Sequence, residues 1–379
     1  MTSPKDRVLV IGSGGIGTIA ALNLEIGGLA EVTSVLRSNF QVARSKGFTI
    51  RSCQHGNIHS WQPTEILDAI PSRYDGQGRP FDFIVCCTKN IPDIIPALYN
   101  IVAPAVTPCH TAIVLIQNGI NIERLFIHRF PNNVIVSGIS RIDAHEVAPG
   151  VIEQKQNDLL YIGAFNNPYL NLKAQEAAAK RFVEIYSMGG KTTCLYKPDV
   201  DVDRWSKLVY NASFNPVCAL TRLNTGELQR SGRVMDTLVV PAMKEVLAVA
   251  KKAGHPLPES IISDTIQTNP INESITPSMQ IDLEKVRRLL TAYISSESDM
   301  KRFRVISLNT RILLGRWSGK DKAEEWLHQY YRLYMNCAAQ CNGNSRRIEL
   351  AFRSEVGSFA AINMAALDSL LCTKRMMTQ

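Results

Sequence analysis

The fold of this 379-residue chain is decided near its start by Arg7-Val8-Leu9-Val10-Ile11-Gly12-Ser13-Gly14-Gly15-Ile16-Gly17. A short apolar strand runs into a glycine-rich turn, and Thr18–Glu25 follows with the composition of a helix. In this context Gly12 permits a tight turn, Gly14 lets the backbone approach a pyrophosphate, and Gly17 lets the helix pack closely on the strand. The stretch predicts a dinucleotide site; the alternative is a glycine-rich surface turn before an ordinary helix. The cofactor-binding residues predicted here are Gly12, Ser13, Gly14, Gly15, Ile16 and Gly17.

The second strand indicates which dinucleotide is bound. Glu31–Leu36 has the pattern of that strand, and it ends at Arg37. An acidic residue at this end would hold a ribose 2′-hydroxyl, whereas a basic residue accommodates a 2′-phosphate. Glu31 lies at the wrong end of the strand to reach the ribose. We therefore expect NADP rather than NAD, with Arg37 as a cofactor-binding residue; the alternative for Arg37 is a solvated surface side chain.

Composition narrows the class of protein. A hydrophobic content of 45% and a mean hydropathy of −0.05 are ordinary for a globular protein, and the length suits two domains. The sequence shows no membrane-length apolar run and no signal peptide, so we expect a cytoplasmic protein. The nine cysteines include no CxxC, and Cys86 and Cys87 lie in an apolar strand, so we expect reduced thiols and no metal.

The net charge of +8 is not read as a sign of nucleic-acid binding. The basic residues are spread along the chain, and no DNA- or RNA-binding motif accompanies them. The charge is better interpreted as attraction for an anionic cofactor and an acidic substrate.

The chain divides once, into an α/β part and an all-α part. The first part alternates apolar strands with helices, shifts toward antiparallel strands near Val151, and is followed from Asp201 by long helical segments. We expect a Rossmann-type nucleotide-binding domain over 1–196 and a helical substrate domain over 197–345. The expected strands cover 31–36, 81–87, 112–116, 133–137, 151–153 and 159–163, and the expected helices 93–98, 174–183, 204–215 and 233–253.

Polar motifs lie where a ligand site should form. Lys89 and the motif Gln117-Asn118-Gly119 each follow an apolar strand, at the edge of a parallel sheet where ligands bind. Lys207, Asn211 and Asn215 are spaced four apart, so they project from one face of a helix and suit an anion and a carbonyl group. A further motif runs from Thr276 through Pro277 and Ser278 to Asp282.

Taken in order over about residues 7–285, these motifs resemble the ketopantoate reductases (2-dehydropantoate 2-reductases). Ala148-Pro149-Gly150 and Trp205-Ser206-Lys207-Leu208 add to the resemblance. It implies NADPH-dependent reduction of a 2-oxo acid, most directly of 2-dehydropantoate to pantoate in pantothenate biosynthesis. The site residues that it implies are Lys207 as the catalytic lysine, Lys89 and Asn118 on the cofactor and substrate sides, and Asn211, Asn215 and Ser278 around the substrate.

The chemistry of ketone reduction agrees with the role implied for Lys207. Hydride delivery develops negative charge on the carbonyl oxygen, and an ammonium beside that oxygen stabilises the charge and can supply the proton. The alternative for Lys207 is a lysine that snorkels from an amphipathic helix. The asparagines could instead bond helix to loop, Ser278 could be a helix N-cap, and Lys89 a plain strand-end lysine.

The resemblance stops near residue 286. Where the family has glycine, arginine and, after two intervening residues, a substrate-binding glutamate, this chain has Val286, Arg287 and Leu290. Residues 286–379 are atypical; they are either a genuine alternative closure of the helical domain or the product of a retained intron or shifted frame. A second functional hypothesis is therefore an NADP-binding protein impaired in catalysis. The oligomeric state, a homodimer included, is left open.

Overall fold

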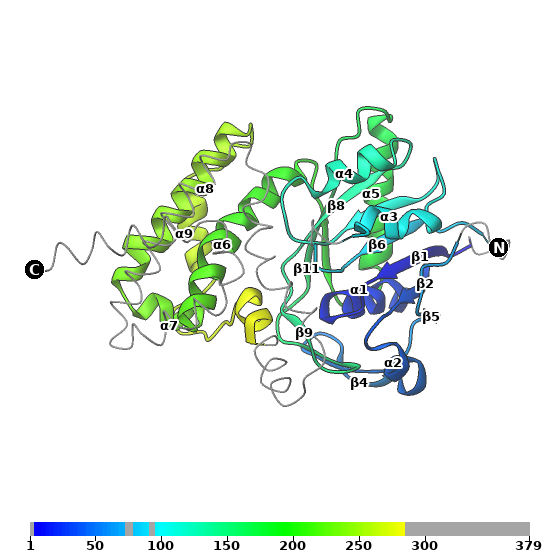
Figure 1. Ribbon diagram of the computed structural model, residues 1–379, viewed down its shortest axis with the longest axis horizontal. Coiled ribbons are helices and arrows are strands. Elements are labelled where there is room, and N and C mark those ends of the chain that lie inside the picture. The colour runs from blue at the N-terminus through cyan, green and yellow to red at the C-terminus, as the bar shows by residue number, and fades with distance from the viewer. Residues whose placement is uncertain (1–3, 73–78, 91–94, 285–379) are drawn as a thin grey trace, which may run out of the picture. The chain divides into compact units, whose positions relative to one another are not determined.

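The computed structural model describes residues 4–72, 79–90 and 95–284 (Figure 1). The described residues divide into two compact units: those up to Tyr210 together with Val246–Ile261, and Asn211–Glu245 together with those from Ile262 onward. The domain boundary expected at residue 196 stays a prediction. Residues 286–379, with Val286, Arg287 and Leu290, lie outside the described residues.

The first unit is built on an eight-stranded sheet of order β12-β11-β8-β7-β6-β1-β2-β5. The strands from β8 to β5 are parallel to their neighbours, while β11 is antiparallel to β8 and parallel to β12. The order of strands along the chain reverses between β1 and β6, and the carboxyl ends of strands at such a point form the ligand crevice of open α/β sheets. The strands are β1 (Asp6–Ile11), β2 (Ala30–Val35), β5 (Glu65–Leu67), β6 (Phe83–Cys86), β7 (Ala112–Leu115), β8 (Ile135–Ser140), β11 (Leu159–Ala164) and β12 (Thr193–Tyr196).

Both faces of this sheet are buried, which explains its continuous apolar strands. Alternate side chains of β1 enter different cores: Val8 and Val10 pack with residues of α1 (Gly15–Ile26) and α5 (Leu172–Ser187), while Leu9 and Ile11 pack with residues of α3 (Leu98–Val102) and α4 (Ile122–Arg129). The expected Rossmann-type fold is confirmed.

The structure contains a second sheet that the sequence did not predict. It has four strands, in the order β4-β3-β10-β9, and it packs with α1 and α2. Its strand β4 is largely exposed, so it lacked the apolar run by which the other strands were found. Its elements, with α2, are β3 (Phe48–Ser52), β4 (Gly56–Trp61), β9 (Ala144–Ala148), β10 (Val151–Gln154) and α2 (Phe40–Lys46).

The helix expected over 93–98 was wrong in its described part. Ile95 and Pro96 form a bend and Ala97 is extended, so α3 begins at Leu98 and runs into a short 3-10 turn at Ala103–Ala105. The cause is Pro96: its ring disfavours helical conformation in the preceding residue, and it has no N–H to donate to a helix.

From α6 onward the described chain is helical, as the sequence predicted. The segment expected over 233–253 is helical but not uniform. Residues Met235–Val239 form a π turn, in which the N–H of Val240 bonds to Met235 O, and the missing N–H of Pro241 explains why the regular ladder is interrupted there. No described helix is both long and apolar enough to cross a bilayer. The helices here are α6 (Val200–Thr221), α7 (Thr225–Arg230), α8 (Val240–Lys252) and α9 (Ser260–Gln267).

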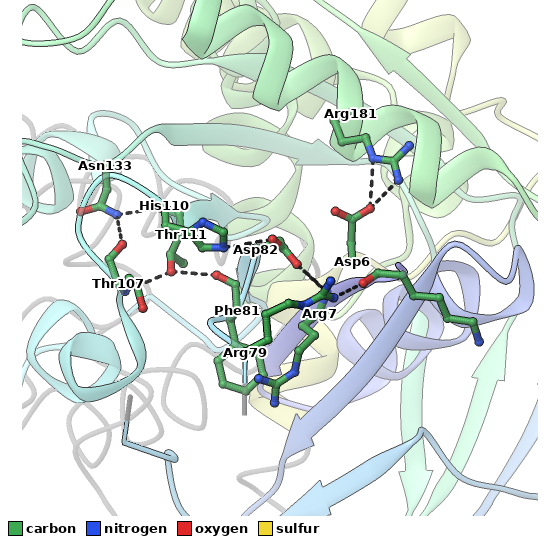
Figure 2. Close-up of polar contacts among 11 residues, drawn as sticks. Asp6, Arg7, Arg79, Phe81, Asp82, Thr107, His110, Thr111, Asn133 and Arg181 are labelled. Atoms are coloured by element: carbon green, nitrogen blue, oxygen red, sulfur yellow. Dashed lines mark hydrogen bonds and ion pairs between the residues drawn. The ribbon is translucent and has the colours of Figure 1, made fainter. Parts of the chain in front are cut away.

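The amino ends of the central strands are joined by a polar cluster (Figure 2). The Asp82 carboxylate accepts from the Arg7 N–H at 2.8 Å and lies 3.0 Å from the His110 ring. Buried Asn133 donates to the carbonyls of Thr107 and Thr111 at 2.9 and 2.8 Å. This edge lies opposite the glycine-rich turn, so the cluster stabilises the sheet away from the predicted ligand edge.

Candidate functional site

The glycine-rich turn follows the carboxyl end of β1, and its glycines differ in the space around them. Gly12 has a φ of +93°, a conformation that favours glycine. Gly14 is exposed at the N-terminus of α1, and a Cβ there would meet no protein atom within 4 Å. A Cβ on Gly17 would instead collide with Gly12 O, and one on Gly15 with Ala144 O. Gly15 and Gly17 therefore serve packing, while Gly14 leaves room for a ligand beside the helix N-terminus.

Sequence reasoning missed two residues that hold this turn. Buried Asn39 donates from Nδ2 to Ser13 O at 2.8 Å and to Glu146 Oε1 at 3.1 Å. Glu146 also accepts from the N–H of Gly150 at 3.0 Å. The only signal in the sequence was an asparagine just after the second strand, while Glu146 is 107 residues further on and could not be paired with it by pattern.

The structure places Arg37 and Glu31 at opposite ends of β2. Arg37 is exposed just beyond the carboxyl end of the strand. Glu31 pairs with Arg7, near the start of β1, so it lies away from the glycine-rich turn. Of these two charged residues, Arg37 is therefore the one that lies at the ligand edge of the sheet.

The loops after β6 and β7 are joined beside Gly12. Gln117 donates from Nε2 to Thr88 O at 2.7 Å and to Thr88 Oγ1 at 3.0 Å. Thr88 lies against Gly12, where it would be the first group met by an added Cβ, at 2.8 Å. Lys89 and Asn118 follow on these loops, and both are exposed. The predicted cofactor-side residues thus come from adjacent loops at one edge of the sheet.

Lys207 lies on α6 and is bound to this same edge. Its Nζ donates to Asn118 Oδ1 at 2.8 Å and to Ser140 O at 2.5 Å. Burial, with smaller contributions from Arg204, Arg141 and Lys89, lowers the pKa of Lys207 from 10.5 to about 7. An ammonium has three N–H donors. The protein engages two of them, and the third can face a ligand. This arrangement can give a proton near neutral pH and stabilise negative charge.

The other predicted substrate residues belong to the second unit. Asn215 is buried and donates from Nδ2 to Asn211 Oδ1 at 3.1 Å, while its own Oδ1 is buried without a hydrogen-bond partner in the described structure. Ser278 is exposed and already helical, because Ile281 N–H bonds to Pro277 O. Ser278 is therefore the first helical residue and not the N-cap. The described ranges contain no group of three or more His, Cys, Asp or Glu placed to hold a metal ion.

The fold is that of a Rossmann-type α/β protein, and the described residues of its second part are helical. Residues 8–167 match the family model described as Ketopantoate reductase PanE/ApbA, and residues 199–296 match its C-terminal model. The chain belongs to the ketopantoate reductase family, a family of oxidoreductases.

Two relatives align with about three quarters of the chain. The uncharacterized protein YDL144C of Saccharomyces cerevisiae is 34% identical over 301 residues, covering 74% of this chain and 83% of that protein. A 2-dehydropantoate 2-reductase of a Nostoc species is 23% identical over 285 residues, covering 75% and 84%.

Solved structures share the fold. The 2-dehydropantoate 2-reductase of Methylococcus capsulatus aligns with a TM-score of 0.64 at 24% identity, over 96% of this chain and 97% of that one. A D-mandelate dehydrogenase bound to NADH and anilino(oxo)acetate aligns with a TM-score of 0.61 at 17% identity, over 81% and 96%.

Proposed function

We propose that this protein reduces a 2-oxo acid to a 2-hydroxy acid with NADPH, and that 2-dehydropantoate is the first substrate to test. The observation that carries the proposal is the position of Lys207, whose Nζ is held by Asn118 and Ser140 at the ligand edge of the sheet, with a pKa of about 7. Family membership and the open glycine-rich turn support the same reaction.

The residues present fit a dinucleotide. The open space at Gly14, beside the N-terminus of α1, suits a pyrophosphate, and Arg37 at the end of β2 suits a 2′-phosphate. When bound, the nicotinamide supplies the hydride. Lys207 stabilises the charge that develops on the substrate oxygen and gives the proton that completes the alcohol, and Asn118 and Ser140 hold the ammonium in place.

The substrate side of the proposal rests on the family resemblance. We assign Asn211, Asn215 and Ser278 to substrate binding, and the unpartnered Oδ1 of Asn215 supports a polar ligand there. Replacing Asn215 with alanine should raise KM for the 2-oxo acid. Replacing the exposed Asn272 of the same unit should leave KM unchanged and serves as the control.

Turnover of a substrate panel tests the proposal. Purified protein is mixed with NADPH and, in turn, 2-dehydropantoate, the 2-oxo acid of mandelate and smaller 2-oxo acids, and NADPH oxidation is followed. NADPH and NADH binding are measured in parallel by calorimetry. Turnover of any of these acids supports reduction, and the best acid defines the substrate class. Tight NADPH binding without turnover would favour the second candidate, an NADP-binding protein impaired in catalysis, which Leu290 in place of the family's glutamate suggests.

A further inference from the structure

Arg204 precedes Lys207 by one helical turn and is almost completely buried, with 4% of its side chain exposed. Its Nε lies 2.9 Å from Oε1 of Glu123, whose side chain is fully buried. Ser137 joins the pair: its hydroxyl accepts from Arg204 Nε at 2.9 Å and donates to Glu123 Oε1 at 2.6 Å. A buried, paired charge of this kind has a large desolvation cost and is often replaceable by apolar residues, so its presence needs a reason beyond stability.

The other two nitrogens of the guanidinium donate hydrogen bonds to backbone carbonyls. Nη1 donates to Gln117 O at 2.8 Å and Gly119 O at 3.0 Å, the two carbonyls that flank Asn118. Nη2 donates to Leu115 O at 3.3 Å and to Gly138 O at 3.2 Å, the latter two residues before Ser140. Arg204 therefore bonds both segments that supply the partners of Lys207 Nζ.

We propose that Arg204, paired with Glu123, is a positioning residue for the reduction, holding Lys207 Nζ at the reacting carbonyl through the Gln117–Gly119 and Gly138–Ser140 segments. This rests on the proposed function of Lys207. The planar fork of an arginine can bond all these carbonyls at fixed angles, which a lysine cannot do. The charge of Arg204 is a second contribution, because a permanent cation one turn away disfavours the protonated form of Lys207.

Two substitutions should shift the titration of Lys207 in opposite directions. The charged groups acting on Lys207 are Arg204 on its own helix, Arg141 after β8 and Lys89 after β6. Glu123 on α4 pairs with Arg204. Arg204→Gln removes a positive charge and should move the basic limb of the kcat profile upward by about one pH unit. Glu123→Gln keeps the shape of its side chain but leaves Arg204 unbalanced, and should move that limb downward.

The geometric part is tested by Arg204→Lys, which keeps the charge and loses the fork. We expect kcat to fall about a hundredfold while the Kd for NADPH stays within about twofold. Arg181→Lys is the matched control: Arg181 also pairs with a carboxylate, Asp6, but at the opposite edge of the sheet, and kcat should be unchanged. Melting temperatures of all variants show whether each is folded. If Arg204→Gln does not fold, Glu123→Gln and Arg204→Lys still test the positioning role of Arg204.

A readout without turnover separates this proposal from the proposed function. Only the neutral amine reacts with an acylating reagent, so labelling of Lys207, followed by mass spectrometry across pH, reports its titration directly. The wild-type midpoint should be about 7 and should move in opposite directions in Arg204→Gln and Glu123→Gln. These shifts without turnover of any 2-oxo acid would refute the function and keep the positioning role. Folded Arg204→Lys and Glu123→Gln proteins with wild-type kcat, pH profile and labelling would overturn it.

Discussion

Replacing Lys207 with methionine should make the protein more stable at neutral pH and nearly inactive. Burial is the main reason that the pKa of Lys207 is lowered from 10.5 to about 7, so folding weakens proton binding by 10.5 − 7, or about 3.5 pKa units. At about 1.36 kcal/mol per unit this corresponds to on the order of 4 kcal/mol near pH 7, and partial solvent access reduces it to about 3 kcal/mol. Losing the bonds to Asn118 and Ser140 costs about 2 kcal/mol. A net gain of about 1 kcal/mol remains.

The pH dependence of stability is the sharper signature. Because the folded pKa lies below the unfolded one, the unfolded chain binds about one more proton between pH 7 and 10.5. The destabilisation is fully present below about pH 7 and is relieved as the pH rises toward 10.5. Over that window the wild-type free energy of unfolding should rise with pH more steeply than that of Lys207→Met, by about 1.4 kcal/mol per unit.

Urea unfolding at pH values of about 7, 8 and 9 measures this difference, and NADPH oxidation under saturating substrate measures kcat. The control is Lys173→Met, at an exposed position of α5, which should change neither slope nor kcat. Loss of Lys207 should lower kcat about a hundredfold or more. Parallel stability curves for wild type and Lys207→Met, or a variant with near-normal kcat, would refute the reasoning.

Further substitutions test other parts of the site and fold. Arg37→Ala should remove most of the preference for NADPH over NADH, about tenfold or more, because only the 2′-phosphate needs the guanidinium; equal Kd values in the wild type would contradict this. Gly14→Ala should weaken dinucleotide binding at unchanged melting temperature, whereas Gly17→Ala should lower the melting temperature because its Cβ would meet Gly12 O; equal effects on stability would sink this distinction. Asn133→Ala should lower the unfolding free energy by about 1–3 kcal/mol without changing kcat, since the buried amide's two hydrogen bonds, to Thr107 O and Thr111 O, are lost at the edge remote from the site; a selective loss of kcat would show otherwise.

Local pattern was enough to predict the features that depend on neighbours in sequence. The glycine-rich turn, the buried strands on either side of it and the helix that carries Lys207 all follow from spacing and apolar periodicity. The two deviations from the predicted helices also have local causes. Pro96 makes α3 begin at Leu98, and the missing N–H of Pro241 interrupts the hydrogen bonds at the π turn.

Features built from distant segments could not be predicted in this way. Asn39 meets Glu146 across 107 residues, and Arg204 reaches Leu115 O across 89. Each is a single polar residue in an otherwise ordinary local setting, and its role appears only when the sheet brings the segments together. The small four-stranded sheet was not predicted either, because its exposed strand β4 has no apolar alternation.

The contact between the glycine-rich turn and the small sheet limits how the turn can be transplanted. Gly15 lies so close to Ala144 O that no side chain fits, and Asn39 links Ser13 O to Glu146. A protein engineer who grafted residues 12–17 into another α/β host would leave behind the surface that shapes them. The transferable module is the turn together with Asn39 and the hairpin of β9 (Ala144–Ala148) and β10 (Val151–Gln154), so recombination between relatives should tolerate crossovers outside this set better than crossovers within it.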